Sequence, residues 1–261
     1  MSEKYVRYRG PIADTEFWGH LSDDDLVSRL TDAPWLGGVS AKEQVALSDV
    51  TLLAPVQPSK IVCIGLNYHA HVQASYSADE APERPLIFLK PSSSVIGPGE
   101  AIVHTNQSER VDYEAELGVV IGKTAKNVPE DNAMDYVFGF TCVNDVTARD
   151  LQKKDGQWSR AKGFDTFCPV GPWIVTELDW QDALVEGIHN DEVKQSGRTS
   201  LMIFNLPYLI SYISSIMTLN PGDLISTGTP SGIAPMKPGD SIRVRVAGIG
   251  TLENHVVESA V

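Results

Sequence analysis

The stretch VDYEAELGVVIG, residues 111–122, carries most of the information on fold and function because it sets three carboxylates among apolar residues. The apolar flanks predict a β-strand, on which alternate side chains project from the same face. Asp112, Glu114 and Glu116 would then share one face, roughly 6–7 Å apart at Cα. Burying three uncompensated carboxylates is strongly unfavourable or shifts their pKa values. A hard divalent cation such as Mg²⁺, Mn²⁺ or Ca²⁺ removes that penalty; a solvated acidic face on an edge strand is the alternative.

Short strands separated by Pro and Gly clusters make up most of the chain from Lys60 onward. One helix is predicted at residues 205–217, with Asn205 as its N-cap and Pro207 in its first turn. We therefore predict an α+β fold that is rich in β and has mixed strands rather than regular βαβ units. Further strands are expected at residues 61–64, 86–89, 138–144, 173–175, 224–227 and 241–246, with a pair around 189–191.

The first 55 residues are predicted to form a small N-terminal module, and residues 56–261 the main domain. Residues 4–8 alternate at the period of a strand, and residues 23–30 are a candidate for a short helix. Prolines at the end of this region then lead into the main body.

The composition excludes several classes of protein. Cys63, Cys142 and Cys168 are isolated, which argues against disulfides and a zinc–thiolate site and favours small buried side chains in a reducing compartment. No apolar run approaches the roughly 20 residues of a membrane helix. The formal net charge is -13 with no basic patch, which argues against a nucleic-acid partner and is typical of a soluble protein. We expect a cytoplasmic protein with neither membrane nor nucleic acid as partner.

A second acidic element follows an apolar strand in GFTCVNDVTARDLQ, residues 139–152, which places Asp145 at the strand end. The next segment, residues 155–173, is dense in Gly, Pro and aromatic residues and predicts a structured loop that shapes a pocket. Lys162 in this loop is the best candidate for chemistry, because a cation near a metal could grip a carboxylate or move a proton. Arg149 could do the same or could simply pair with Asp150.

The segment LISTGTPSG, residues 224–232, is a strand that runs into a loop of hydroxyl residues and glycines. Such a loop offers hydroxyls and backbone N–H groups to an anion. It lacks the Walker pattern, so we do not infer nucleotide binding. A plain tight turn is the alternative.

These segments together resemble the fumarylacetoacetate hydrolase family over roughly residues 55–255. The resemblance also rests on IGLNY followed by His71, on FLKP at residues 88–91 and on AKGFDTFCPVGPW. It implies a mixed β-sandwich roll, a homodimer, and Mg²⁺ or Mn²⁺ as cofactor. By position the implied metal ligands are Glu114, Glu116 and Asp145, with Asp112 beside them.

The resemblance also implies a small 2-oxo acid as substrate, chelating the metal. Lys162 would contact it, Thr229 would bind its carboxylate end, and Arg149 and Gln152 would flank the site. Family activities are hydrolysis of acylpyruvates such as fumarylpyruvate, decarboxylation of oxaloacetate and isomerisation of hydroxy-dienedioates, all through a metal-stabilised enolate. We rank C–C hydrolysis first, isomerisation or decarboxylation next, and a non-catalytic oxo-acid-binding protein last.

One position departs from the hydrolytic pattern. His71 stands at the expected catalytic His, but Ala74 replaces the Glu that follows it by three residues. Alanine can neither accept a proton nor orient an imidazole, so the water-activating pair is incomplete. Gln73 could orient His71, and Asp79, Glu80 or Glu83 could supply a carboxylate from a stretch, residues 76–85, that we expect to close over substrate.

Overall fold

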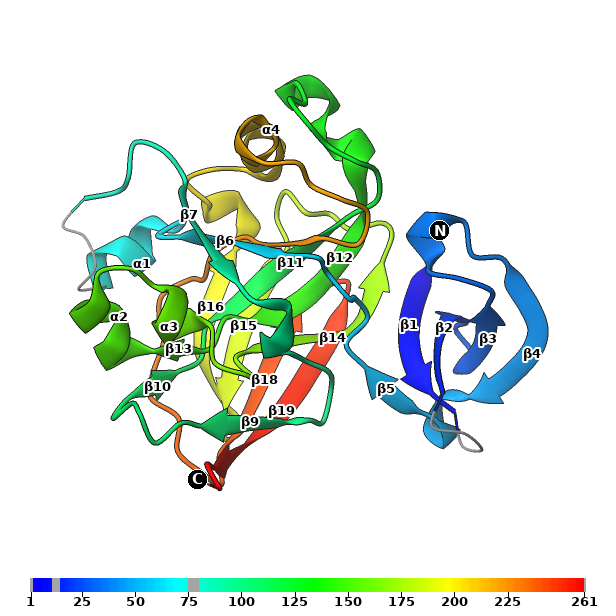
Figure 1. Cartoon of the computed structure of the whole chain (residues 1–261), viewed down its shortest axis with the longest axis horizontal. Helices are drawn as coiled ribbons and strands as arrows, with labels where there is room; N and C mark the ends of the chain where they lie inside the picture. The colour runs from blue at the N-terminus through cyan, green and yellow to red at the C-terminus, as the bar shows by residue number, and fades with distance from the viewer. Residues whose placement is uncertain (1, 11–14, 75–79, 261) are drawn as a thin grey trace.

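A computed structural model describes residues 2–10, 15–74 and 80–260 of the chain. Two β-sheets pack face to face in the main body and share one hydrophobic core (Figure 1). Leu117 and Phe140 from one sheet and Val185, Val244 and Leu252 from the other are buried in this core. Most neighbouring strands are antiparallel, but β17–β6, β19–β9 and β14–β8 are parallel, so the predicted β-rich, mixed architecture is confirmed.

The larger sheet supplies the strands that carry the acidic residues. Its order through the main body is β14-β12-β11-β17-β6-β7, which puts β11 beside both β12 and β17. Its strands here are β6 (Ile61–Gly65), β7 (Leu86–Lys90), β8 (Val95–Ile96), β11 (Ala115–Ile121), β12 (Val137–Asn144), β14 (Cys168–Val175) and β17 (Leu224–Ser226).

The second sheet has five strands in the order β16-β15-β18-β19-β9. Along β18 the buried side chains are Ile242, Val244 and Val246, which alternate with more exposed residues because successive side chains point to opposite faces. The strands are β9 (Ala101–His104), β15 (Leu184–His189), β16 (Glu192–Arg198), β18 (Ser241–Val246) and β19 (Gly250–Glu258).

The N-terminal strands form a lobe at one side of the molecule (blue in Figure 1) that continues the larger sheet. Lys4 of β1 pairs with Val175 of β14, which joins the lobe to the main body. The helix expected at residues 23–30 is wrong, because Leu26–Leu30 forms β3 and pairs with β2. The division at residue 55 stays a prediction. The strands are β1 (Lys4–Arg9), β2 (Glu16–Leu21), β3, β4 (Ser40–Ala46) and β5 (Thr51–Leu53).

The helices are few and short. α4 (Leu206–Ile216) is the predicted one, and the Asn205 side chain caps it by accepting from Tyr208 N at 3.0 Å. No helix in the described ranges is long and apolar enough to cross a membrane, and all three cysteines are buried. The other helices are α1 (His69–Ala74), α2 (Arg149–Asp155) and α3 (Ser159–Lys162), with 3-10 turns at Pro34–Leu36, Leu47–Asp49, Ser92–Ser94, Glu130–Tyr136 and Thr199–Leu201.

The single strand expected over the acidic stretch is interrupted. Val111–Asp112 is β10, which pairs with β13 (Thr147–Ala148) in a separate ribbon, and β11 begins only at Ala115. Between them, Glu114 N donates to the Asn144 side chain at 2.9 Å, and the Glu114 carbonyl accepts from Asp145 N at 2.9 Å. These local bonds replace the regular ladder and turn the chain at the point where the carboxylates meet.

Candidate active site

Three buried carboxylates meet where β11 begins and β12 ends. One carboxylate oxygen each from Glu114, Glu116 and Asp145 lies within 4.8 Å of the others. The residues are 4%, 2% and 1% exposed, so solvent does little to separate their charges. They come together because Ala115 pairs with Asn144 in neighbouring antiparallel strands. The structure therefore brings together the three residues predicted as metal ligands.

Two of these carboxylates already have cationic partners. Lys162 Nζ donates to Glu114 Oε2 at 2.9 Å and also to Asp145, and Arg149 donates to the other Glu114 oxygen. Lys90 Nζ donates to Asp145 Oδ1 at 2.6 Å. Burial by itself raises the pKa of Glu114, but Lys162 and Arg149 outweigh it and hold that pKa well below its usual range. Burial likewise lowers the pKa of Lys162, but Asp145 and Glu114 outweigh it and leave the pKa raised.

Glu116 differs because its hydrogen-bond partners among the described residues are neutral. Its Oε2 accepts from Ser226 Oγ at 2.5 Å and from Gly228 N at 2.8 Å. Burial, with the neighbouring Asp145 and Glu114, raises the pKa of Glu116 to about 8. A cation bound at this carboxylate would favour its ionised form. Three clustered carboxylates are a donor set that suits a hard divalent cation, so the residues fit Mg²⁺ or Mn²⁺.

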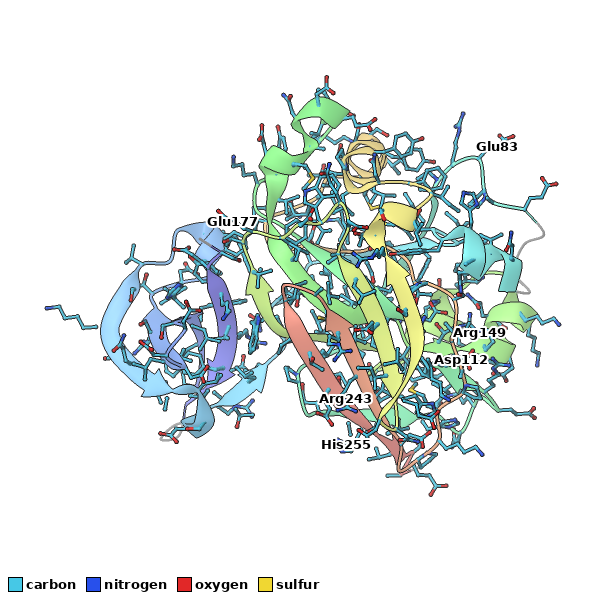
Figure 2. All side chains as sticks on the ribbon, turned by 180° about the vertical axis from the view of Figure 1, so that it is seen from behind. Glu83, Asp112, Arg149, Glu177, Arg243 and His255 are labelled. Carbon is cyan, nitrogen blue, oxygen red and sulfur yellow. The ribbon has the colours of Figure 1, made fainter. Side chains whose placement is uncertain are left out.

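Arg149 donates hydrogen bonds to several side chains at the edge of the site rather than pairing with its sequence neighbour Asp150. Its Nε donates to Asp112 Oδ2 at 2.9 Å and its Nη1 donates to Gln152 Oε1 at 2.5 Å. Figure 2 shows Arg149 and Asp112 side by side. Asp150 instead accepts from the Ser108 hydroxyl, so the alternative pairing of Arg149 with Asp150 is wrong. The guanidinium is thus fixed with its charge towards the carboxylates.

Thr229 lies in the glycine-rich loop that follows β17, and its hydroxyl is engaged within the protein. It donates to the Ala115 carbonyl at 2.8 Å and accepts from Gln195 Nε2 at 2.8 Å. Gln195 is fully buried, and its Oε1 accepts from Ala115 N at 2.9 Å. Gln195 therefore ties β16 of the second sheet to the acidic strand. Sequence reasoning missed it, and it also missed Lys90, although FLKP was among the motifs.

His71 on α1 is the candidate base. It is 6% exposed, and within the described ranges nothing hydrogen-bonds to its Nδ1. Burial lowers the pKa of His71, which favours the neutral ring that can accept a proton. Asn67 fixes the start of α1, because its Nδ2 donates to the Thr227 carbonyl at 2.7 Å.

Two of the three carboxylates suggested as replacements for the missing Glu are in the described ranges, and neither is bonded to His71 there. Glu80 and Glu83 are exposed, and Figure 2 shows Glu83 well apart from Arg149. Asp79 and the Ala74 side chain lie outside the described residues, as does part of the stretch expected to close over substrate.

One pocket is lined by the residues predicted for the site. Its cavity measures ≈ 20 Å³, room for about one water molecule. Its lining contains every residue predicted for the site, namely His71, Glu114, Glu116, Asp145, Arg149, Gln152, Lys162 and Thr229. The remaining lining residues are Ile64, Gly65, Leu66, Phe88 and Trp158.

Comparison with known sequences covers nearly the whole chain. Residues 60–257 match the family model described as "Fumarylacetoacetate (FAA) hydrolase C-terminal", and residues 3–55 match one described as "Rv2993c-like, N-terminal". Oxaloacetate tautomerase YisK from Bacillus subtilis (strain 168) is 43% identical over 267 residues, which cover 97% of this chain and 83% of YisK.

Solved structures extend the likeness to three dimensions. The 2-hydroxyhepta-2,4-diene-1,7-dioate isomerase from Mycobacterium marinum gives a TM-score of 0.91 at 41% identity, covering 99% of this chain and 100% of the isomerase. Maleylpyruvate hydrolase from Sphingobium sp. SYK-6, solved with manganese (II) ion and pyruvate, gives 0.78 at 28% identity, covering 98% and 99%. The fold class predicted from the sequence, with its N-terminal module, is confirmed by these likenesses.

Proposed function

This chain belongs to the fumarylacetoacetate hydrolase family of enzymes, and we propose that it catalyses a divalent-metal-dependent interconversion of the keto and enol forms of a small 2-oxo acid. One observation carries the proposal: a buried carboxylate triad, in which Glu116 accepts hydrogen bonds from neutral donors, shares its pocket with a buried His71. A 2-oxo dicarboxylate such as oxaloacetate is the substrate class that we favour.

The metal would be held by Glu114, Glu116 and Asp145. Glu116 Oε1 receives no hydrogen bond from the part of the chain that the structure describes, and so remains available as a ligand atom. Bound there, Mg²⁺ or Mn²⁺ supplies Lewis-acid polarisation of the 2-oxo group. The manganese of the maleylpyruvate hydrolase structure supports this choice of ions.

The protein's own groups would bind the substrate and move its proton. The raised pKa of Lys162 favours its ammonium form, which can bind a negatively charged group of the substrate. Arg149 and Gln152, hydrogen-bonded to each other, flank the same space. His71 Nδ1 would accept the proton from the carbon next to the carbonyl. As that C–H bond breaks, its electron pair forms the C=C bond and the carbonyl π pair moves to oxygen. The oxygen then takes a proton from the protonated His71, directly or through water, which gives the enol hydroxyl and returns His71 to its neutral form. The reverse sequence returns the keto acid.

Proton transfer is favoured over hydrolysis because hydrolysis needs an activated water. Ala74 removes the carboxylate expected to help His71 activate a water, whereas Nδ1 of His71, unpartnered among the described residues, can still accept a proton from carbon. YisK, named as an oxaloacetate tautomerase, and the M. marinum isomerase point the same way. C–C hydrolysis of an acylpyruvate such as fumarylpyruvate is the second candidate, supported by maleylpyruvate hydrolase and its bound pyruvate.

Oxaloacetate added as its enol separates the candidates. We expect Mn²⁺ to accelerate the decay of the enol absorbance in the presence of the protein, and excess EDTA to abolish that acceleration. No metal-dependent acceleration would overturn the tautomerase proposal. Pyruvate released from fumarylpyruvate would then support the hydrolase, and CO₂ released from oxaloacetate a decarboxylase. Metal binding without turnover of any of these acids would support a non-catalytic binding protein.

We also propose that residues 56–261 carry the chemistry and that residues 1–55 are an accessory module. Every lining residue of the pocket lies at or after Ile64, which supports this division. A homodimer remains a prediction from the family.

A further inference from the structure

We propose that Trp158 is a specificity-determining residue, which limits the substrate to short 2-oxo acids by closing the apolar side of the pocket. The inference rests on the proposed function, because it concerns the substrate of the same site. It selects four-carbon 2-oxo dicarboxylates over seven-carbon ones.

The position of Trp158 is set by close packing against the end of β6. A Cβ atom added to Gly65 would lie 2.7 Å from Trp158 Cζ3, so the indole lies directly against the Gly65 backbone. The Trp158 ring also meets Phe88 edge-on, with ring centroids 5.2 Å apart. Gly65 therefore makes room for the indole, and Phe88 holds it from the side.

The apolar wall of the pocket is formed by Ile64, Gly65, Leu66, Phe88 and Trp158, and Lys162 Nζ lies over the Phe88 ring at 4.8 Å from its centroid. The two lysine and arginine groups that line the pocket, Lys162 and Arg149, are both bonded to Glu114. Both carboxylates of a four-carbon acid can stay near these two cations. The distal carboxylate of a longer acid would extend past Lys162 to the Trp158 indole, which offers it no ion pair, and losing its hydration there is strongly unfavourable.

The cavity of ≈ 20 Å³ must widen to admit either acid, and it must widen further for the longer chain. Trp158 is a partly exposed residue of its lining, whereas Phe88 and Gly65 belong to strands, so we expect the additional room to be limited by Trp158. Trimming the indole would open the pocket towards solvent, where a distal carboxylate could keep its water. A longer substrate would then bind without the cost of desolvating its distal carboxylate.

Trp158 also belongs to the segment that carries Lys162. Its carbonyl accepts from Lys162 N at 2.9 Å in the first turn of α3. Any residue at position 158 can make this backbone hydrogen bond. Substitutions at this position therefore change the apolar wall of the pocket but keep the hydrogen bond to Lys162 N. The side chain of Trp158 can therefore be tested separately from the position of Lys162.

The experiment compares kcat/KM for the enol of oxaloacetate and for 2-hydroxyhepta-2,4-diene-1,7-dioate with Mn²⁺-loaded enzyme. In Trp158→Ala we expect the ratio of the longer to the shorter substrate to rise about tenfold or more, with Trp158→Phe in between. Trp180→Ala is the matched control, since Trp180 is also partly buried but packs against the main core outside the pocket lining. Its ratio should match that of the wild type.

An unchanged ratio in folded Trp158→Ala, or an equal rise in Trp180→Ala, would overturn the inference. Should Trp158→Ala fail to fold, the ratio in Trp158→Phe decides in the same way. If the wild type converts neither substrate, the proposed function fails, and the length limit is judged by calorimetric titration of Mn²⁺-loaded protein with oxalate and 2-oxoheptanedioate. Selective strengthening of 2-oxoheptanedioate binding in Trp158→Ala would still support the limit, and equal changes for both would refute it.

Discussion

Replacing Glu116 by glutamine should stabilise the metal-free protein at alkaline pH and abolish its stabilisation by metal. Burial and the nearby Asp145 and Glu114 raise the pKa of Glu116 from 4.5 to about 8. Ionising this side chain in the folded, metal-free protein is therefore unfavourable by on the order of 5 kcal/mol relative to the unfolded chain. Glutamine has nearly the same shape, and its carbonyl can accept from Ser226 and Gly228, but it carries no charge.

The sign of the pH dependence follows from the direction of the shift. A carboxyl whose folded-state pKa is raised binds its proton more tightly in the folded state. The penalty is thus absent below about pH 4.5, grows as pH rises towards 8 and is complete above 8. In EDTA, wild type and Glu116→Gln should unfold at similar temperatures at pH 5, and the variant should be more stable at pH 9.

Thermal unfolding monitored by circular dichroism measures both effects. At roughly 2 °C per kcal/mol for a chain of this size, the variant's advantage at pH 9 approaches about 10 °C. Mn²⁺ at a thousandfold excess over Kd should raise the free energy of unfolding of the wild type by about 4 kcal/mol, and its unfolding temperature accordingly. The unfolding temperature of Glu116→Gln should not change with Mn²⁺. Glu253→Gln, at an exposed carboxylate, is the control and should behave as wild type. A metal-free Glu116→Gln that is less stable than wild type at pH 9, or equally stabilised by Mn²⁺, would refute the reasoning.

Four further substitutions test other parts of the site. Lys162→Met leaves Glu114 and Asp145 without their shared cation and should lower metal-free stability by about 3–5 kcal/mol in chemical denaturation, with partial recovery in Mn²⁺; undiminished stability would contradict the bridging role. His71→Ala should lower kcat roughly 10²–10⁴-fold while calorimetry finds Mn²⁺ affinity unchanged; full turnover would exclude His71 as the base. Gln195→Leu removes buried bonds to Ala115, Thr229 and Pro230 and should lower the free energy of unfolding by about 2–3 kcal/mol; a neutral effect would mean that these bonds are dispensable. Ala74→Glu should raise fumarylpyruvate hydrolysis relative to tautomerisation of oxaloacetate; an unchanged ratio of the two rates would show that the missing carboxylate is not what limits hydrolysis.

The parts of the site that are local in the chain could be predicted from the sequence. The i, i+2 spacing of Glu114 and Glu116 and the place of Asp145 at a strand end are short-range patterns, and the structure sets these side chains together. The helix capped by Asn205 was predictable for the same reason, since cap and apolar face lie within a dozen residues.

Features decided by distant partners could not be predicted. Gln195 lies in a strand with many exposed residues, and only the packing of the two sheets brings its amide to Ala115, 80 residues earlier in the chain. Residues 26–30 carry too weak a local preference to distinguish helix from strand, and pairing with β2 decides for β3. Thr229 was expected to bind the carboxylate end of the substrate, but in the fold its hydroxyl donates to the Ala115 carbonyl.

The most direct test of the metal centre is anomalous diffraction from crystals soaked with Mn²⁺ and oxalate. The account predicts one manganese peak at roughly 2.1–2.3 Å from a carboxylate oxygen of each of Glu114, Glu116 and Asp145, with oxalate completing the coordination on the pocket side. A peak elsewhere, or none while oxalate binds in the pocket, would contradict it.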